Sequence, residues 1–368
     1  MSEIAPGDYE FIGSKNSYYS AKVRACLQYK RIPYSEVCAN ADTIRRAIEL
    51  TGSHMYPVVR CPDGTVLQDS CDIVDSLEAR HPERPVIPDD PVLRLVATLV
   101  ETVADDFMIR SAIGFRWIPK DTAEWAMRLF TQICSERLTD PEARAVAREQ
   151  GVRIARSIQR RVAGMPEFVQ RASREVCLDL CDRLDAHLEQ TPFLLGDRPS
   201  LADLAMMNAI YGHLYRDPGE ICDHIHWRCI SLSLWVEHML AAAGESDRGG
   251  LFVVAGLESL LEGFRVFSEL ARATLESADA ILPGHVAGDV PAAALESVES
   301  RMAGTPMSLL TSPYVAWKLQ RLAKRYREIP EARQAEADGL MEKAGFLDVC
   351  RHRPSWRLVK RDFKLVVA

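Results

Sequence analysis

The first 85 residues alternate short apolar runs with stretches of helical periodicity. Tyr19, Val23, Cys26 and Leu27 recur at the spacing of one helix face, which predicts a helix over residues 18–29. Pro62-Asp63-Gly64 is a turn signal between two short apolar runs and predicts a β-hairpin. The other expected elements are strands at 9–12 and 33–38, a helix at 43–50 stopped by Gly52, hairpin strands at 56–60 and 65–67, and a helix at 70–80.

This order of elements, strand–helix–strand and then helix–strand–strand–helix, predicts an α/β domain of the thioredoxin-like type over residues 1–85. A proline-rich linker at 81–91 cannot continue a helix. Helical patterns follow to about residue 245, so we expect an all-helical domain over 90–247. Within it, Ser200 and Asp203 have the spacing of a capping box at the start of an apolar helix.

Residues 250–368 form a third segment, for which we expect a mainly helical extension. An amphipathic helix is predicted over 251–282 and a loop rich in glycine and proline over 283–291. Further helices and a strand near 356–367 complete the chain. A length of 368 residues suits such a division into two or three domains.

Composition indicates a globular protein of a reducing compartment. The chain is 47% apolar and 26% charged, and it has no apolar run of the about 18 residues that a membrane helix needs. Its start lacks the basic-then-apolar plan of a secretory signal. Ten cysteines follow no metal-binding or disulfide rhythm. We therefore expect a cytoplasmic protein.

The net charge of −7 argues against nucleic acid as a partner. The charge is uneven, because residues 316–368 hold 13 basic and 7 acidic side chains while the rest of the chain carries −13. We expect this basic segment to dock internally or against a second subunit, since it contains no block of consecutive basic residues. Contact with an anionic surface is the alternative.

An acidic residue and a serine open the last helix of the first domain. Gln68-Asp69-Ser70 follows the hairpin, and Tyr56-Pro57-Val58-Val59 forms its first strand. The N-terminus of a helix favours an anion, so this pair of motifs can hold a small zwitterionic peptide by its backbone and its charged terminus. A simple helix-capping role fits Ser70 equally well.

These features together resemble the cytosolic glutathione transferase superfamily. The resemblance covers residues 9–85 and 90–245 and says nothing about the extension. It implies that the N-terminal domain binds glutathione as a co-substrate and that the helical domain supplies a pocket for a hydrophobic electrophile, usually in a homodimer. The matching stretches, in the family's order, are 17–24 (Ser-Tyr-Tyr-Ser-Ala-Lys-Val-Arg), 56–59, 68–70 and 193–203 (Phe-Leu-Leu-Gly-Asp-Arg-Pro-Ser-Leu-Ala-Asp).

The resemblance also implies roles for individual residues. The Tyr56–Pro57 bond is expected to be cis and to present the Tyr56 backbone to the cysteinyl part of glutathione, although tyrosine is bulkier than the family's usual residue here. Asp69 is expected to accept a hydrogen bond from the γ-glutamyl ammonium group. Ser70 is expected to bind the γ-glutamyl carboxylate.

Ser17 is the candidate for stabilising the glutathione thiolate. A hydroxyl at a helix N-terminus can lower the pKa of a thiol from its usual value of about 8.5. A role as helix cap is compatible with this one, and the fallback candidates are Tyr18, Tyr19 and Ser20. No cysteine stands at the helix start and Cys26 is expected in the core, so disulfide reduction is not expected.

Three further groups of polar residues stand out in the sequence. Cys222, His224, His226 and Cys229 have no second cluster to complete a tetrahedral set, so no metal site is expected. Cys177 and Cys181, one helical turn apart, are expected to be packing residues. The third group is Asp105, Asp106 and Arg110, on the first helix after the linker. These residues either line the acceptor pocket or form an ion-paired helix face.

The sequence therefore predicts a glutathione transferase-like enzyme. The glutathione thiolate attacks an electrophilic centre of a hydrophobic small molecule in a conjugation, an isomerisation or a cleavage. The alternative is a binding or scaffolding protein that keeps the fold without turnover, which Tyr56 and the extension favour. A third hypothesis is that the extension directs a catalytic core to a membrane or a protein partner.

Overall fold

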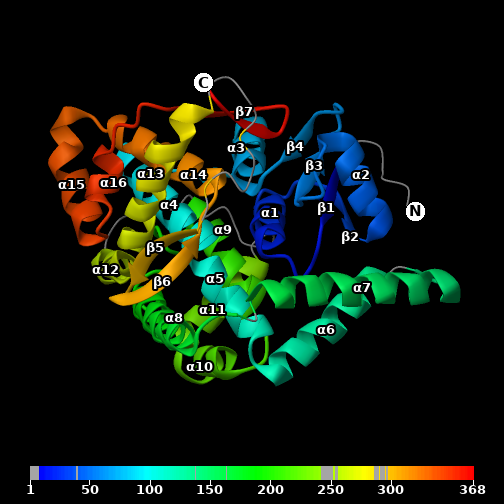
Figure 1. Ribbon diagram of the computed structural model, residues 1–368. Coiled ribbons are helices and arrows are strands. Elements are labelled where there is room, and N and C mark those ends of the chain that lie inside the picture. Colours follow the sequence, from blue (N-terminus) through cyan, green and yellow to red (C-terminus); the bar gives the residue numbers. More distant parts are fainter. Residues whose placement is uncertain are drawn as a thin grey trace. The chain divides into compact units, whose positions relative to one another are not determined.

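The structure is a computed structural model that describes residues 8–38, 40–136, 138–162, 164–241, 252, 256–285, 290, 295 and 297–368 (Figure 1). The chain divides into two compact units, each assembled from three segments. Unit 1 comprises residues 1–86, 109–165 and 203–247, and unit 2 comprises residues 87–108, 166–202 and 248–368. Because the helical region contributes to both units, the predicted domain boundaries at 85, 90, 247 and 250 stay a prediction.

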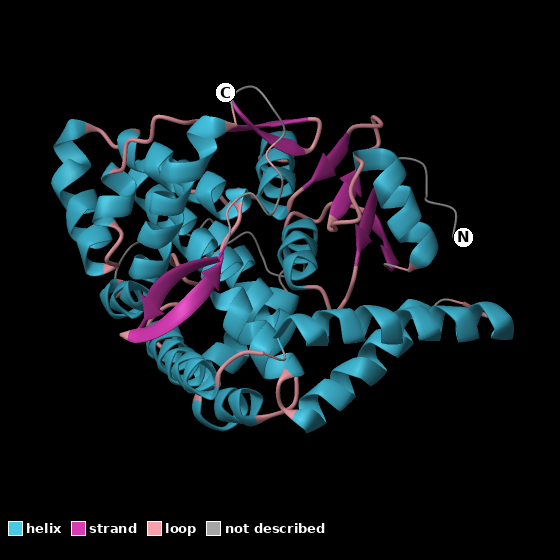
Figure 2. Ribbon diagram, in the orientation of Figure 1, coloured by secondary structure: helices cyan, strands magenta, loops and turns pink. Residues whose placement is uncertain are grey.

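Unit 1 contains a four-stranded sheet with the strand order β2-β1-β3-β4 (Figure 2). Strand β1 runs parallel to β2 and antiparallel to β3, and β3 pairs with β4 as the predicted hairpin. The bounds are β1 Tyr9–Gly13, α1 Tyr18–Tyr29, β2 Tyr34–Cys38, α2 Ala41–Thr51, β3 Val58–Arg60, β4 Val66–Gln68 and α3 Ser70–Arg80. The predicted elements of the α/β domain are all present, with ends that differ by at most two residues.

The core of this domain lies between the sheet and the helices α1 and α3, which pack against each other. Phe11 and Val59 from the sheet and Val23, Leu27 and Ile73 from the helices are fully buried. This apolar contact fixes where α1 and α3 begin relative to the ends of the strands. The first residues of the two helices are the predicted site.

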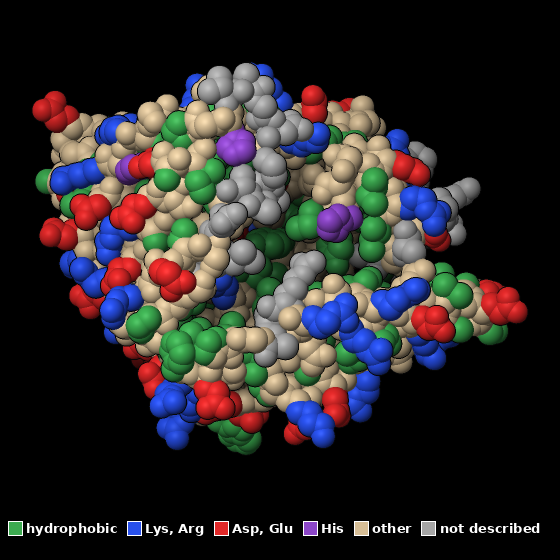
Figure 3. Space-filling view, viewed as in Figure 1, with side chains coloured by type: hydrophobic (Ala, Val, Ile, Leu, Met, Phe, Trp, Pro, Cys, Tyr) green, Lys and Arg blue, Asp and Glu red, His purple; other side chains and the backbone are tan. Residues whose placement is uncertain are grey.

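Helices complete unit 1, and α6 and α7 form a long pair within it. Trp117, Ala126, Phe130 and Ala155 build a small core between them. A β-carbon at Gly151 would lie 2.9 Å from the backbone oxygen of Phe130, so glycine permits the close crossing. Most side chains of α7 are exposed, and Figure 3 shows acidic and basic groups mixed on it. The bounds are α5 Met108–Trp117, α6 Lys120–Ser135, α7 Pro141–Val162, α9 Leu201–Ala209, the π-helix η2 Ile210–Leu214, α10 Glu220–Arg228 and α11 Ile230–Leu240.

Unit 2 is mainly helical and joins α4 and α8 to the extension. Helix α14 packs on α4, and α12 packs on α8. The bounds are α4 Pro91–Thr102, the π-helix η1 Val103–Phe107, α8 Glu167–Leu188, α12 Glu258–Phe264, η3 Arg265–Phe267, α13 Ser268–Ile281, η4 Leu282–Gly284, β5 Ser297–Met302, β6 Thr305–Leu310, α14 Pro313–Arg327, η5 Glu331–Arg333, α15 Gln334–Lys343, α16 Leu347–Arg351, β7 Leu358–Arg361 and β8 Lys364–Val367.

The extension differs from the sequence prediction in three places. One is the β5–β6 hairpin, which lies where further helices were expected. The helix expected over 251–282 begins only at Glu258 and is interrupted by the 3₁₀ turn η3, which lets Phe264 and Phe267 both be buried, with the Phe267 ring stacked on Phe107. Its first residues, except 252, lie outside the described residues up to 255. The single strand expected at the end is a hairpin, β7–β8, whose turn residues Asp362 and Phe363 have positive φ.

The basic segment docks internally, as one of the two expected arrangements. Lys318 of α14 lies 2.9 Å from an Asp105 carboxylate oxygen and 3.4 Å from one of Asp106. Arg321 pairs with Glu101, and Arg333 pairs with Asp90. Charge on the extension is thus matched by acidic residues of the 87–108 segment of the same unit. None of the described helices has an apolar stretch long enough to cross a membrane.

Candidate functional site

The start of α3 holds the predicted acidic–serine pair. Asp69 is the N-cap, and its carboxylate accepts a hydrogen bond from the Cys71 backbone N–H at 2.9 Å. Asp69 has φ 78° and ψ 129°, a conformation that non-glycine residues rarely adopt. Such backbone conformations cost about 1–3 kcal/mol and concentrate at functional sites. Ser70 is buried at the first position of the helix.

Tyr56 and Pro57 precede the hairpin on the same sheet. The bond between them is cis, as the resemblance implies. Pro57 is buried, and β3 begins directly after it. Gln68, next to Asp69, donates a side-chain hydrogen bond to the Met55 carbonyl at 2.8 Å. This bond ties the segment before Tyr56 to the end of β4, so the two motifs of the sequence lie together.

The Tyr56 side chain lies close to α6. Burial raises the pKa of its phenol to about 12, with a smaller effect from the nearby Cys134 thiol of α6. Glu136, which follows α6, also approaches the N-terminal domain, because it forms an ion pair with Lys15 at 2.6 Å. The end of α6 therefore borders the region of Tyr56.

Ser17 stands at the start of α1, as predicted. It is the N-cap, and its hydroxyl oxygen accepts a hydrogen bond from the Ser20 backbone N–H at 3.4 Å. Ser17 is half-buried, whereas Ser20 and Tyr18 are buried. Tyr19 is half-buried and its ring meets that of Tyr18 edge to face. Cys26 is fully buried in α1, and burial raises the pKa of its thiol to about 12, so its placement in the core is confirmed.

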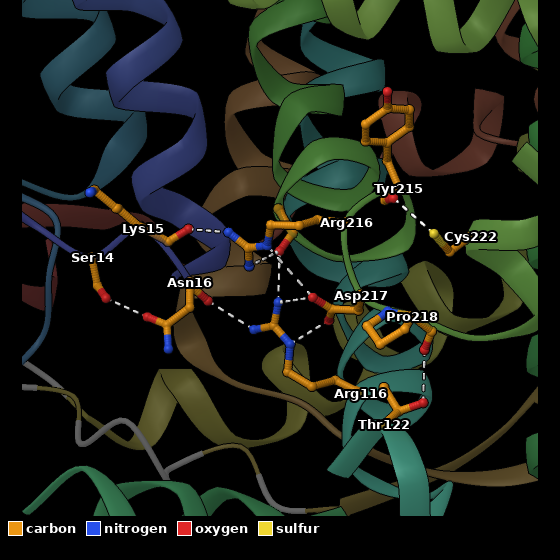
Figure 4. Close-up of polar contacts among 11 residues, drawn as sticks. Ser14, Lys15, Asn16, Arg116, Thr122, Tyr215, Arg216, Asp217, Pro218 and Cys222 are labelled. Atoms are coloured by element: carbon orange, nitrogen blue, oxygen red, sulfur yellow. Dashed lines mark hydrogen bonds and ion pairs between the residues drawn. The ribbon is translucent and has the colours of Figure 1, made fainter. Parts of the chain in front are cut away.

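A buried ion pair lies beneath the loop before α1, which the sequence did not reveal (Figure 4). Arg116 of α5 binds both carboxylate oxygens of Asp217, at 2.5 and 2.9 Å. The same guanidinium donates to the carbonyl of Asn16 at 2.8 Å and to that of Gly212 at 2.7 Å. Arg116 thus joins the loop that carries Ser17 to the π-helix η2. Its partner Asp217 is 101 residues away in the chain, so no local pattern indicates the pair.

Several other residues singled out in the sequence form contacts within the fold. Asp105 and Asp106 lie in η1 and pair with Lys318, which corresponds to the ion-paired alternative. Cys177 and Cys181 are both buried in α8. The Cys222 thiol donates to the Tyr215 carbonyl at 3.1 Å, and burial raises its pKa. His226 bonds the Cys222 carbonyl through Nδ1 at 2.8 Å.

Comparison with known proteins gives a family for the N-terminal domain. Residues 11–85 match the family described as "Glutathione S-transferase, N-terminal domain". No curated protein matches the sequence. Among solved structures, the β-etherase LigF from Sphingobium sp. strain SYK-6 is 21% identical, with 64% of this chain and 97% of that chain covered and a TM-score of 0.45.

Two solved glutathione S-transferase structures have comparable sequence identity to this chain. One, from Ceriporiopsis subvermispora in complex with glutathione, is 18% identical, with 63% and 98% of the chains covered and a TM-score of 0.40. The other, from Methylobacillus flagellatus KT with glutathione bound, is 20% identical, with 64% and 98% covered and a TM-score of 0.36. These overall scores are low, so the family assignment rests on the N-terminal match. The comparisons thus show that residues 11–85 match the glutathione S-transferase N-terminal domain family.

Proposed function

We propose that unit 1 binds glutathione at the starts of α1 and α3 and that the protein is a glutathione transferase-like enzyme. The observation that carries the proposal is the pair Asp69–Ser70 at the start of α3, inside a domain that matches the family. Asp69 keeps an unfavourable backbone conformation there, and Ser70 is buried at a helix N-terminus. Both features are accounted for by a peptide ligand whose charged end lies at this helix start.

In this proposal each predicted residue has one role. Asp69 accepts a hydrogen bond from the γ-glutamyl ammonium group, and Ser70 binds the γ-glutamyl carboxylate with the help of the helix dipole. The Tyr56 backbone beside Pro57 pairs with the cysteinyl part. This arrangement directs the thiol of the bound peptide towards the start of α1.

Ser17 is the proposed catalytic residue. A half-buried hydroxyl at the N-cap of α1 can donate to a thiolate, and the helix N-terminus adds positive potential, so the thiol loses its proton at lower pH. The thiolate then attacks an electrophilic carbon of a hydrophobic small molecule. Helical residues of 90–247 are the proposed acceptor pocket, and a homodimer is the proposed assembly.

The test is glutathione consumption with a panel of apolar electrophiles, including aryl halides and aryl ethers. Ser17→Ala is expected to lower kcat/KM about tenfold near pH 7, the effect of one hydrogen bond to a charged group. Ser76→Ala on α3, which removes a hydroxyl away from the proposed site, is the matched control and should change nothing. Equal rates for Ser17→Ala and wild type would exclude the role of Ser17.

A binding protein without turnover is the second candidate, and Tyr56 favours it. Its phenol lies near Cys134, and Glu136 forms an ion pair with Lys15, so the bulky Tyr56 side chain and the end of α6 lie beside the proposed peptide site. Saturable binding of glutathione without turnover of any electrophile in the panel would support this candidate. Measurable turnover would exclude it.

A further inference from the structure

Arg116 and Arg216, here called the arginine pair, share one carboxylate beneath the loop of residues 14–17 (Figure 4). Arg116 takes both oxygens of Asp217 at hydrogen-bond distance. The Arg216 Nε atom lies 3.7 Å from one of these oxygens, which is an ion pair but too long for a hydrogen bond. Two positive charges thus face one negative charge in the interior of unit 1.

Backbone carbonyls hold both guanidinium groups against the loop. Arg216 donates to the Lys15 carbonyl and, at 2.8 Å, to the Gly212 carbonyl. Arg116 donates to the Asn16 carbonyl, the next one along the loop. The two guanidinium groups therefore contact consecutive carbonyl groups, immediately before Ser17, the residue proposed to stabilise the thiolate.

The surrounding charged groups do not cancel the excess. Arg24 of α1 is matched by Glu36, and Lys15 is matched by Glu136. His213 of η2 is buried, and burial together with the arginine pair holds its pKa well below the usual value, so it is neutral at pH 7. The Tyr211 ring lies 6.0 Å from the Arg216 guanidinium carbon. Asp217 is the carboxylate among the described residues that acts on Arg216, so about one positive charge remains.

Two further observations indicate that an anion is favoured near the arginine pair and the loop of residues 14–17. Burial and the neighbouring Arg116 lower the pKa of Arg216 to about 10, as expected for a cation whose charge is not fully balanced by nearby carboxylates. The Asn16 amide nitrogen is buried and has no hydrogen-bond partner, so a donor at the loop is left available. The N-terminus of α1 adds its own partial positive charge one residue further on.

We propose that Arg216 is a positioning residue whose excess charge, anchored through Arg116 and Asp217, stabilises the thiolate form of the peptide thiol bound beside Ser17. The inference rests on the proposed function, because it specifies how that site ionises its thiol. Ser17 supplies the local hydrogen bond, and Arg216 supplies a field that acts through the loop. Arg216 itself touches neither the thiol nor the electrophile.

The experiment is a pH titration of the thiolate absorbance of glutathione bound to the full-length protein. Arg216→Gln keeps a polar side chain but removes the charge, and it should raise the pKa of the bound thiol by about one unit. Arg216→Lys keeps the charge and should leave the pKa within about 0.3 unit of wild type. Arg45→Gln removes an exposed charge from α2 of the same unit and is the matched control.

The outcomes separate this inference from the proposed function. Absence of saturable glutathione binding by folded wild type would overturn both. Binding with an unchanged thiol pKa in folded Arg216→Gln, or an equal rise in the Gln and Lys variants, would overturn only the charge role. Wild type gives a test that needs no variant, since a bound thiol that titrates at its free value of about 8.5 contradicts the inference.

Discussion

The Arg116–Asp217 pair is the interaction on which the loop before α1 most depends. Both side chains are almost entirely buried, and the guanidinium makes two bonds to the carboxylate and two to backbone carbonyls. Arg116→Met keeps much of the apolar volume but leaves a buried carboxylate without its main partner. Removing one member of a buried pair costs about 3–5 kcal/mol. We expect a loss of about 4 kcal/mol in the free energy of unfolding.

A double-mutant cycle isolates the pair from the rest of the fold. Asp217→Asn alone leaves the arginine pair without any carboxylate and should also cost about 3 kcal/mol. The double variant Arg116→Met/Asp217→Asn buries no unpaired charge at this position except Arg216. The free energy of unfolding that the double variant loses should be about 2 kcal/mol smaller than the sum of the losses of the two single variants.

Urea unfolding followed by tryptophan fluorescence measures these differences. Trp117 and Trp235 are buried in unit 1 and report on the part of the molecule that contains the pair. A loss below about 1 kcal/mol for Arg116→Met, or additive losses in the double variant, would refute the reasoning. Either result would mean that solvent or another group replaces the partner without cost.

Three further predictions concern other parts of the chain. Asp69→Gly removes the cap but relieves the positive φ, so the free energy of unfolding should stay within about 1 kcal/mol while the glutathione Kd rises at least about tenfold; a strongly destabilised variant would contradict this. His213 is buried, and burial holds its pKa well below 6.5, so below pH 6.5 the unfolded chain binds a proton that the folded chain does not. The free energy of unfolding should therefore fall by up to about 1.4 kcal/mol per pH unit as the pH drops below 6.5. His213→Phe should remove this part of the slope, and a variant with the same pH profile as wild type would exclude the role of His213. Lys318→Met leaves the Asp105 and Asp106 carboxylates together and should cost about 3–5 kcal/mol, measured by hydrogen exchange in α4 and α14; unchanged protection would show that Lys318 does not hold the extension.

Local signals explain which parts of the fold could be predicted. The turn Pro62-Asp63-Gly64 sets the β3–β4 hairpin, and Gly64 takes the positive φ that such a turn requires. The β7–β8 hairpin was missed because its turn places Asp362 and Phe363 at positive φ without any glycine. A phenylalanine in that conformation is held by its surroundings, and no propensity reveals it.

The candidate site divides in the same way. Ser17 and Asp69 are helix caps, so their positions follow from the residues next to them. Arg116, Arg216 and Asp217 act through contacts between segments about 100 or 200 residues apart, and such contacts exist only once the helices have packed. The electrostatic part of the site therefore needed the structure.

Calorimetric titration of glutathione into the full-length protein at pH 7 tests the central claim most directly. The account predicts saturable binding with a Kd between micromolar and millimolar. It also predicts that Ser70→Ala weakens this binding at least about tenfold, whereas Ser76→Ala, six positions further along the same helix, leaves it unchanged. A folded wild-type protein that takes up no glutathione, or a Ser70→Ala variant that binds as tightly as wild type, would contradict the account.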